Sequence, residues 1–180
     1  GGRVLVVARS KELLSQNWEK YTWLDPKGLV RAGIYSAGMN MRQLGCQVTF
    51  GGVQSICNRA QELGKIDAII SDECHQISFD PKSQYRTLIS GIRAVNPAAR
   101  FFGLTATPFR TDGVIHGSDR SLFDRMSYVV PLSDMFDNKW LTRPITLPSD
   151  QVDMTGVKIT AGEYNQGETQ SKFLEYWNAN

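Results

Sequence analysis

Short runs of apolar residues alternate, along the first 110 residues, with stretches whose apolar positions recur at helical spacing. The short runs are typical of buried strands, and the stretches between them are typical of amphipathic helices. Alternation of this kind predicts an α/β domain: a parallel sheet with helices on both faces. The expected strands are residues 3–8, 29–36, 48–50, 67–71 and 101–104.

Three helices are expected between these strands. Ser10 can cap the first helix, with Glu12 in its first turn. Asp80 and Pro81 are expected as the cap and the first residue of the third helix. The apolar positions that mark the helices are Leu14, Trp18 and Tyr21, then Val53, Ile56, Cys57, Ala60 and Leu63, then Tyr85, Leu88, Ile89, Ile92 and Val95.

The regular alternation stops after Phe109. Residues 110–120 are polar and are expected to form a loop, followed by a strand at 127–131, a short helix at 132–140 and a strand at 143–147. The tail is rich in Gly, Gln and Asn, with one possible helix near residues 168–177. We therefore expect one domain over residues 1–147 and a linker or interdomain segment over 148–180.

Bulk properties exclude a few classes of protein. No apolar run approaches the about 18–20 residues that cross a bilayer, and the chain starts without a signal-like segment, so we expect a cytoplasmic protein without a membrane partner. Cys46, Cys57 and Cys74 include no CxxC pair, which favours three reduced thiols. The net charge of +2 does not indicate a nucleic-acid binder, so local groups would have to bind DNA or RNA.

Two adjacent acids, Asp72 and Glu73, follow one of the buried strands, and His75 comes two residues later. Ligands of open α/β sheets bind at the carboxyl ends of the strands. One acid there can hold Mg²⁺ and the next can orient or deprotonate an attacking water, which are the two needs of phosphoryl transfer. The alternative is a solvated strand exit, because two acids are common after any buried strand.

Thr105 and Thr107 end the next expected strand along the chain. Their hydroxyls can hydrogen-bond to acidic or histidine side chains at the end of a neighbouring strand. The alternative is a β-branched strand end that makes only local hydrogen bonds.

Four segments, and the order in which they follow one another along the chain, resemble superfamily 2 helicases of the DExH branch. The sequences D-E-C-H at 72–75 and G-L-T-A-T-P-F-R at 103–110 resemble motifs II and III. The sequence R-V-L-V-V-A-R-S-K-E-L-L-S-Q at 3–16 resembles motif Ia, and V-T-F-G-G-V-Q-S-I at 48–56 resembles a later segment with a Gln-Ser pair. Residues 3–110 taken together resemble bacterial RadD-type helicases and their phage relatives. The resemblance is looser from residue 129 onward, and the joint order is far more specific than any one motif.

The resemblance implies that this chain is part of an ATP-dependent helicase or translocase, with residues 1–147 as a partial first RecA-like motor domain and with ATP and Mg²⁺ as cofactors. Asp72 would hold the Mg²⁺, Glu73 would activate the hydrolytic water, and His75 would join Thr105 and Thr107 in coupling nucleotide state to nucleic-acid grip. We expect DNA rather than RNA as the substrate, and a second RecA-like domain as the partner of this one. The residues implied at the nucleic acid are Arg9, Ser10, Gln54, Ser55 and Arg110. For both arginines, a surface salt bridge or a solvated charge is the alternative.

The sequence departs from this family in one respect. A phosphate-binding loop, G-x-x-x-x-G-K-[ST], should precede motif Ia, and this sequence contains none. We therefore expect the fragment alone to hydrolyse ATP at background rate, because that loop supplies much of the positioning in phosphoryl transfer. The strand of the loop should pair beside residues 101–104, so its absence predicts an unpaired sheet edge there.

Two other functions compete with the helicase. One is a motor-like module that grips nucleic acid or protein without hydrolysing nucleotide, which the lack of the phosphate loop favours for the fragment. The other is a metal-dependent nuclease that uses Asp72 and Glu73, although no second acidic cluster at a strand end is visible.

Overall fold

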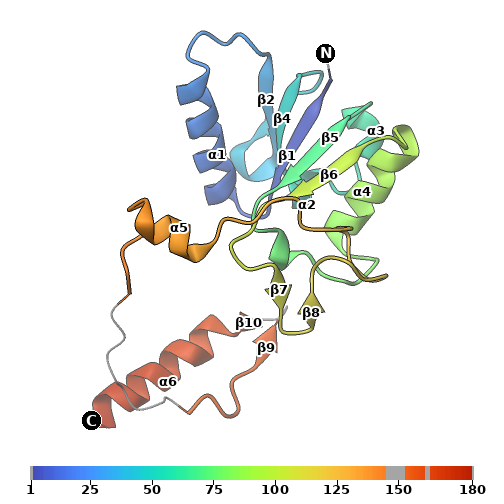
Figure 1. Cartoon of the computed structure of the whole chain (residues 1–180). Helices are drawn as coiled ribbons and strands as arrows, with labels where there is room; N and C mark the ends of the chain where they lie inside the picture. Colours follow the sequence, from blue (N-terminus) through green and yellow to red (C-terminus); the bar gives the residue numbers. More distant parts are fainter. Residues whose placement is uncertain (1, 145–152, 161–162, 180) are drawn as a thin grey trace.

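A six-stranded sheet forms the centre of the protein in a computed structural model, which describes residues 2–144, 153–160 and 163–179 (Figure 1). The strand order is β3-β2-β4-β1-β5-β6. All neighbouring strands are parallel except β2 and β3, which are antiparallel. The strands are β1 (Val4–Ala8), β2 (Ala32–Ser36), β3 (Met41–Arg42), β4 (Val48–Gly52), β5 (Ala68–Ser71) and β6 (Arg100–Gly103).

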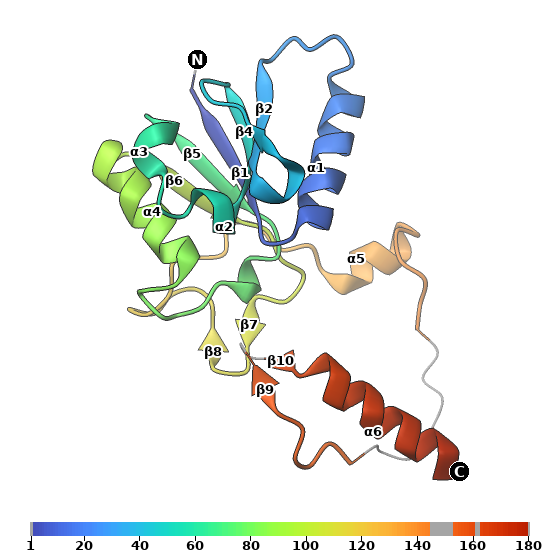
Figure 2. The ribbon, with the colours of Figure 1, turned by 180° about the vertical axis from the view of Figure 1, so that it is seen from behind.

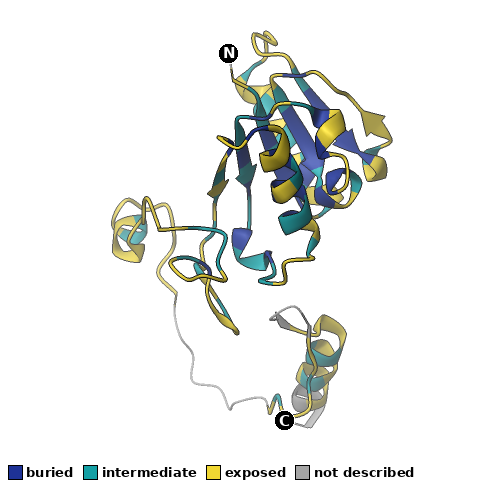
Figure 3. Cartoon of the chain, turned by 90° about the vertical axis from the view of Figure 1, so that its right-hand side faces the viewer, coloured by how far each residue is buried: buried dark blue, intermediate teal, exposed yellow. Residues whose placement is uncertain are grey.

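Helices cover both faces of this sheet. Helix α1 (Lys11–Leu24) lies on one face, and α2 (Val53–Ile56), α3 (Ala60–Leu63) and α4 (Gln84–Val95) lie on the other (Figures 1 and 2). Side chains of a strand alternate between the faces. In β1, Leu5 and Val7 accordingly lie in the core beneath α2–α4, whereas Ala8 lies in the core beneath α1. The expected fold class is confirmed, and Figure 3 shows the buried residues concentrated in the strands and the inner sides of the helices.

Helix α1 begins as the sequence predicts. The Ser10 hydroxyl accepts a hydrogen bond from the backbone N–H of Leu13 (3.2 Å), which satisfies one donor of the first turn. Hydrogen bonds from its own backbone N–H and from Ser10 lower the pKa of Glu12 in that turn. The rings of Trp18 and Tyr21 pack against Phe50 of β4, with ring centroids 5.5 and 5.3 Å away.

The other two helices differ from the prediction: the third begins later than expected, and the second is divided in two. The Asp80 carboxylate accepts the N–H of Lys82 (2.9 Å), and the Asp80 carbonyl accepts the N–H of Ser83 (3.0 Å). These bonds close a turn, so α4 begins at Gln84 and the prediction of a cap at Asp80 is wrong. The second expected helix is divided into α2 and α3, because the chain turns between them, where Arg59 N–H bonds to the carbonyl of Ile56.

The segment after β6 departs further from expectation. The predicted loop holds a hairpin, β7 (Phe109–Arg110) and β8 (Gly113–Val114). Residues 127–131 form no strand: the segment has no ladder partner within the described part of the chain, and Tyr128 is 84% exposed. Residues 143–144 are not in a strand, and the rest of the strand expected at 143–147 lies outside the described residues.

Two helices expected late in the chain are confirmed. Helix α5 (Leu132–Asp137) is shorter than the expected 132–140, and α6 (Gln166–Ala179) includes the helix expected near 168–177. A small hairpin, β9 (Ile159–Thr160) and β10 (Glu163–Tyr164), precedes α6. The boundary at residue 147 stays a prediction.

Strand β6 lies at one edge of the sheet. Among the described residues it pairs only with β5, so the expectation of an open edge at this strand agrees with the structure. The ring of Phe101 stacks on Phe123 at 4.9 Å between centroids, whereas Phe102 is 49% exposed. None of the described helices combines the length and apolar character that a membrane span requires.

Candidate functional site

The parallel strands bring the candidate residues to one end of the sheet. The register pairs Val7 of β1 with Gly51 of β4 and with Ser71 of β5, and it pairs Ser71 with Gly103 of β6. The four strands therefore end at nearly the same level. The segments that follow them carry the candidates from motifs Ia, II and III and from the Gln-Ser segment.

Glu73, His75 and Thr105 form a contact triad across the ends of β5 and β6. The Nδ1 atom of His75 lies 2.9 Å from the Thr105 hydroxyl and 3.3 Å from Oε2 of Glu73. The sequence predicted that the threonine hydroxyls can bond to acidic or histidine side chains of a neighbouring strand end, and the Thr105 hydroxyl lies beside His75. A shift of either the Glu73 or the Thr105 side chain would therefore affect the position of His75.

Backbone hydrogen bonds hold the two strand ends together beyond the sheet. Leu104 N–H donates to the carbonyl of Ser71 (2.9 Å), and Cys74 N–H donates to the carbonyl of Leu104 (3.0 Å). Between them, Glu73 adopts a left-handed conformation with φ of 48°. Such a φ is uncommon outside glycine and costs free energy, so the surrounding bonds must hold it in place. Residues Cys74–Gln76 then form the short 3₁₀ turn η2, which carries His75.

The Thr105 hydroxyl links the two threonines. It accepts the backbone N–H of Thr107 (3.0 Å) and lies 3.1 Å from the Thr107 carbonyl, to which it can donate. When its one proton goes to that carbonyl, the hydroxyl oxygen accepts from His75, so Nδ1 carries a proton. The Glu73 carboxylate, 3.3 Å from the same nitrogen, can act as a second acceptor in this arrangement. Asp72 accepts the N–H of Glu73 through Oδ1 (3.0 Å) and is half-buried.

Cys74, which follows the two acids, is packed tightly against β6. Cys74 is 2% exposed, and burial raises the pKa of its thiol to about 11. A Cβ added to Gly103 would lie 2.4 Å from Cζ of Phe123 and 2.6 Å from Sγ of Cys74. Only glycine at residue 103 lets the strand approach the motif II turn this closely.

We expect Gly103→Ala to destabilise the protein by about 1–3 kcal/mol, because a methyl group must displace the Phe123 ring and the Cys74 thiol. Thermal unfolding monitored by circular dichroism measures this loss. Gly28→Ala is not a matched control, because Gly28 has a φ of 61°. Gly38→Ala is one, since the nearest atoms to its Cβ are 3.8 Å away, and it should change the unfolding temperature little. An equally stable Gly103→Ala variant would contradict the close approach.

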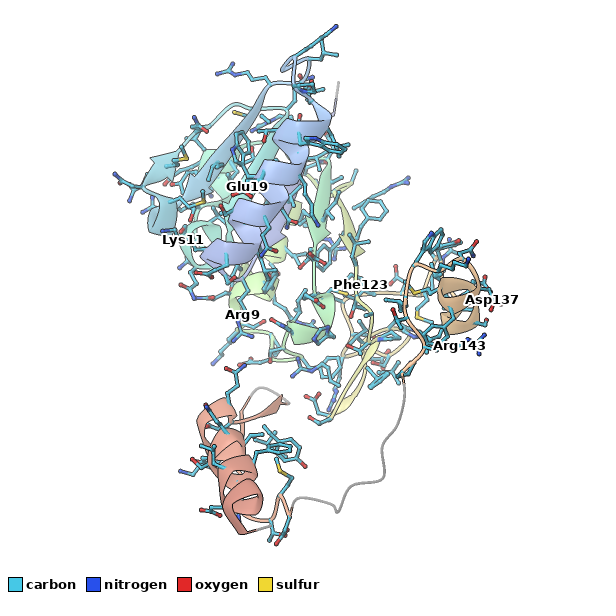
Figure 4. All side chains as sticks on the ribbon, turned by 90° about the vertical axis from the view of Figure 1, so that its left-hand side faces the viewer. Arg9, Lys11, Glu19, Phe123, Asp137 and Arg143 are labelled. Atoms are coloured by element: carbon cyan, nitrogen blue, oxygen red, sulfur yellow. The ribbon has the colours of Figure 1, made fainter. Side chains whose placement is uncertain are left out.

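The residues implied at the nucleic acid lie in two segments, after β1 and after β4. Arg9 is exposed where α1 begins, and Figure 4 shows it near Lys11 at that end of the domain. The Ser10 hydroxyl caps α1, and the Ser55 hydroxyl accepts the N–H of Ala37 (2.9 Å). Gln54 is exposed. Both serine hydroxyls thus have an intramolecular role, and exposed Arg9 and Gln54 are the side chains most available to a ligand.

Arg110 lies elsewhere. Only 6% of its side chain is exposed, and its guanidinium donates to the carbonyls of His75 (2.8 Å) and Ile77 (3.3 Å). It also lies over the ring of Phe79, with Cζ 5.6 Å from the centroid, and Arg120 lies over the same ring at 4.9 Å. Phe79 and Arg120 were not singled out from the sequence, because neither belongs to a motif and their meeting depends on the β7–β8 hairpin.

The parallel α/β sheet and the strand ends that carry an acid, a histidine and a threonine in contact define a helicase-type motor domain of superfamily 2. The chain belongs to the family described as "Type III restriction enzyme, res subunit", whose profile matches residues 1–110. That match includes β1–β6 and every candidate residue named above.

Among solved structures, the chain is similar to "Crystal structure of the UvsW helicase from Bacteriophage T4", at 17% identity and a TM-score of 0.43. The alignment covers 60% of this chain and 38% of that one, so the chain spans less than half of the helicase's length. A likeness of this size carries no argument about activity. No curated protein matches the chain.

Proposed function

We propose that the chain is the first motor domain of an ATP-dependent nucleic-acid helicase or translocase. The observation that carries this proposal is the contact of Glu73, His75 and Thr105 across the ends of β5 and β6. Membership of the family supports it. Residues 148–180 would connect this domain to a second RecA-like domain, with the nucleotide between the two.

The acids at the end of β5 fit a magnesium–nucleotide complex. Carboxylates are the hard oxygen ligands that Mg²⁺ prefers, and Asp72 and Glu73 are both half-buried at the strand end. Among the described residues, no three His, Cys, Asp or Glu side chains gather around a possible metal position. Mg²⁺ would therefore bind to Asp72 together with phosphate oxygens and water, which is its usual arrangement with nucleotides. When bound, it spreads the negative charge of the phosphates.

Glu73 would orient the attacking water and take its proton. A carboxylate can act in this way only if it stays ionised and fixed in direction. The left-handed backbone at Glu73 and the neighbouring His75 Nδ1 together direct the side chain. A movement of the Glu73 side chain would then shift His75. Through its contact with His75, Thr105 would shift too, and with it the backbone of Thr107. This chain of contacts would couple nucleotide state to the grip on nucleic acid.

The segments after β1 and β4 would contact the phosphodiester backbone. Arg9 and Gln54 supply exposed donors, and Ser10 and Ser55 hold the local backbone. Such contacts are blind to sequence, which suits an enzyme that moves along a strand. We propose DNA rather than RNA as the substrate.

The proposal predicts that the full-length protein hydrolyses ATP and that single-stranded DNA raises kcat at least about tenfold, whereas RNA of equal length raises it less. A coupled ATPase assay with and without each nucleic acid measures this. The chain on its own should show only background turnover, since it contains no phosphate-binding loop. Binding of DNA by the full-length protein without any ATP turnover would instead support the non-hydrolysing module.

A further inference from the structure

We propose that Arg110 is a positioning residue, which fixes the η2 turn and thereby the direction of His75. The inference rests on the proposed function for its catalytic consequence, but its structural part can be tested without any turnover. It assigns to Arg110 a role within the motor domain in place of a contact to nucleic acid.

Two donors of Arg110 reach the motif II turn. Nη1 donates to the carbonyl of His75 at 2.8 Å and to the carbonyl of Ile77 at 3.3 Å. These carbonyls belong to His75 itself and to Ile77, the residue directly after η2. The internal bonds of the turn use other carbonyls, those of Glu73 and Cys74, as acceptors. Arg110 therefore adds an anchor that the turn does not supply itself.

The Arg110 side chain is in turn held in one orientation. Nε donates to Oδ1 of Asp112 at 2.8 Å, across the β7–β8 hairpin. That hydrogen bond is the first cause of the lowered pKa of the Asp112 carboxyl. The guanidinium is planar and presents its donors in a fixed fork, so a bond at Nε sets the direction of Nη1. A lysine cannot reproduce this geometry.

Aromatic and backbone contacts complete the support. Arg110 and Arg120 both lie over the ring of Phe79, with Cζ atoms 5.6 and 4.9 Å from its centroid. Arg120 Nη2 donates to the carbonyl of Asp112 at 3.1 Å, and Arg86 of α4 donates to the carbonyl of Arg120. Hydrogen bonds through Arg120 thus connect the β7–β8 hairpin to α4.

These contacts connect the last residue of motif III and the hairpin after it back to motif II. A shift of β7 would move Arg110 and, through its two carbonyl bonds, the turn that carries His75. His75 is the residue that contacts both Glu73 and Thr105. Small displacements of such groups are costly, because a misplacement of about 1 Å can lower a rate by about 100-fold.

The test measures hydrogen exchange and turnover in the full-length protein with Arg110→Gln, Arg110→Lys and, as matched control, Arg93→Gln. Arg93 is exposed on α4. In Arg110→Gln and Arg110→Lys, the amides of Gln76 and Ile77 should exchange roughly tenfold faster or more, while those of β1 and β5 stay protected. The control should leave all of these rates unchanged.

Turnover provides the second readout. Arg110→Gln should lower kcat by about 10- to 100-fold with little change in KM for ATP, and Arg110→Lys should not restore it. If the wild-type protein has no ATPase activity but the exchange result holds, the proposed function fails and the positioning role stands. Unchanged exchange at residues 76 and 77 in both variants would overturn the inference.

Asp112→Asn covers the case in which Arg110 variants lose protection throughout the domain. The Asp112 side chain is 49% exposed, so its replacement should not unfold the core. It weakens the bond to Nε and should speed exchange at residues 76 and 77 by about two- to fivefold. Exchange identical to wild type in Asp112→Asn, with unfolded Arg110 variants, would show that Arg110 acts only on global stability and would also overturn the inference.

Discussion

Replacing Glu73 by glutamine should lower the ATP turnover of the full-length protein by about 10²–10⁴-fold, the contribution of a positioned general base. Glutamine keeps the length of the side chain and can still accept a hydrogen bond from His75, which lies 3.3 Å away. It cannot take a proton from water. Affinity for ATP and for nucleic acid should therefore change little, so the loss appears in kcat.

Steady-state ATPase kinetics and a nucleotide-binding titration on the same preparation separate the two effects. Glu19→Gln is the matched control: Glu19 is exposed on α1, away from the strand ends (Figure 4), and its replacement should leave kcat unchanged. A Glu73→Gln variant with more than about a tenth of the wild-type kcat would show that another group takes the proton.

Leu88→Ala should destabilise the domain by about 2–5 kcal/mol, the usual cost of truncating a fully buried leucine. The Leu88 side chain lies in the core between α4 and the sheet and has no exposed surface. Truncation removes apolar contacts and leaves a cavity that the surrounding helices and strands fill only in part. At the upper end of this range, the loss is a large fraction of the stability of an ordinary domain.

Urea denaturation followed by tryptophan fluorescence measures the change in the free energy of unfolding. Val95→Ala is the control on the same helix, because Val95 is 40% exposed and its truncation should cost well under about 1 kcal/mol. Equal effects of the two substitutions would contradict the burial of this face of α4.

Periodicity was enough to predict the five parallel strands and the larger helices, but not the two-residue antiparallel strand β3. Strands β1, β4 and β5 are short apolar runs with buried residues, whereas β6 is an apolar run at the sheet edge with none of its residues fully buried. Leu14 and Leu88 mark the inward faces of α1 and α4. Parallel strands end at a common edge, so the sequence placed the motif II and motif III segments at the same edge of the sheet. That β5 and β6 are neighbours there is a finding of the structure.

The pattern of apolar and polar residues did not predict local hydrogen bonds in turns or contacts between residues distant in sequence. Asp80 followed by Pro81 is a typical helix start, but the Asp80 carboxylate closes a turn that ends before α4 begins at Gln84. The hairpin β7–β8 contains only two residues in each strand, which is too short for an alternating pattern. Arg110 has the charge expected of a phosphate contact, and only the folded hairpin turns its guanidinium toward the motif II turn.

The most direct test of this account is a crystal structure of the full-length protein with Mg²⁺ and a transition-state analogue of ATP hydrolysis. We predict that the metal is bound at Asp72, that the attacking water is within hydrogen-bonding distance of Glu73, and that His75 keeps its contact with Thr105. A nucleotide bound away from the carboxyl ends of β5 and β6 would contradict the motor assignment.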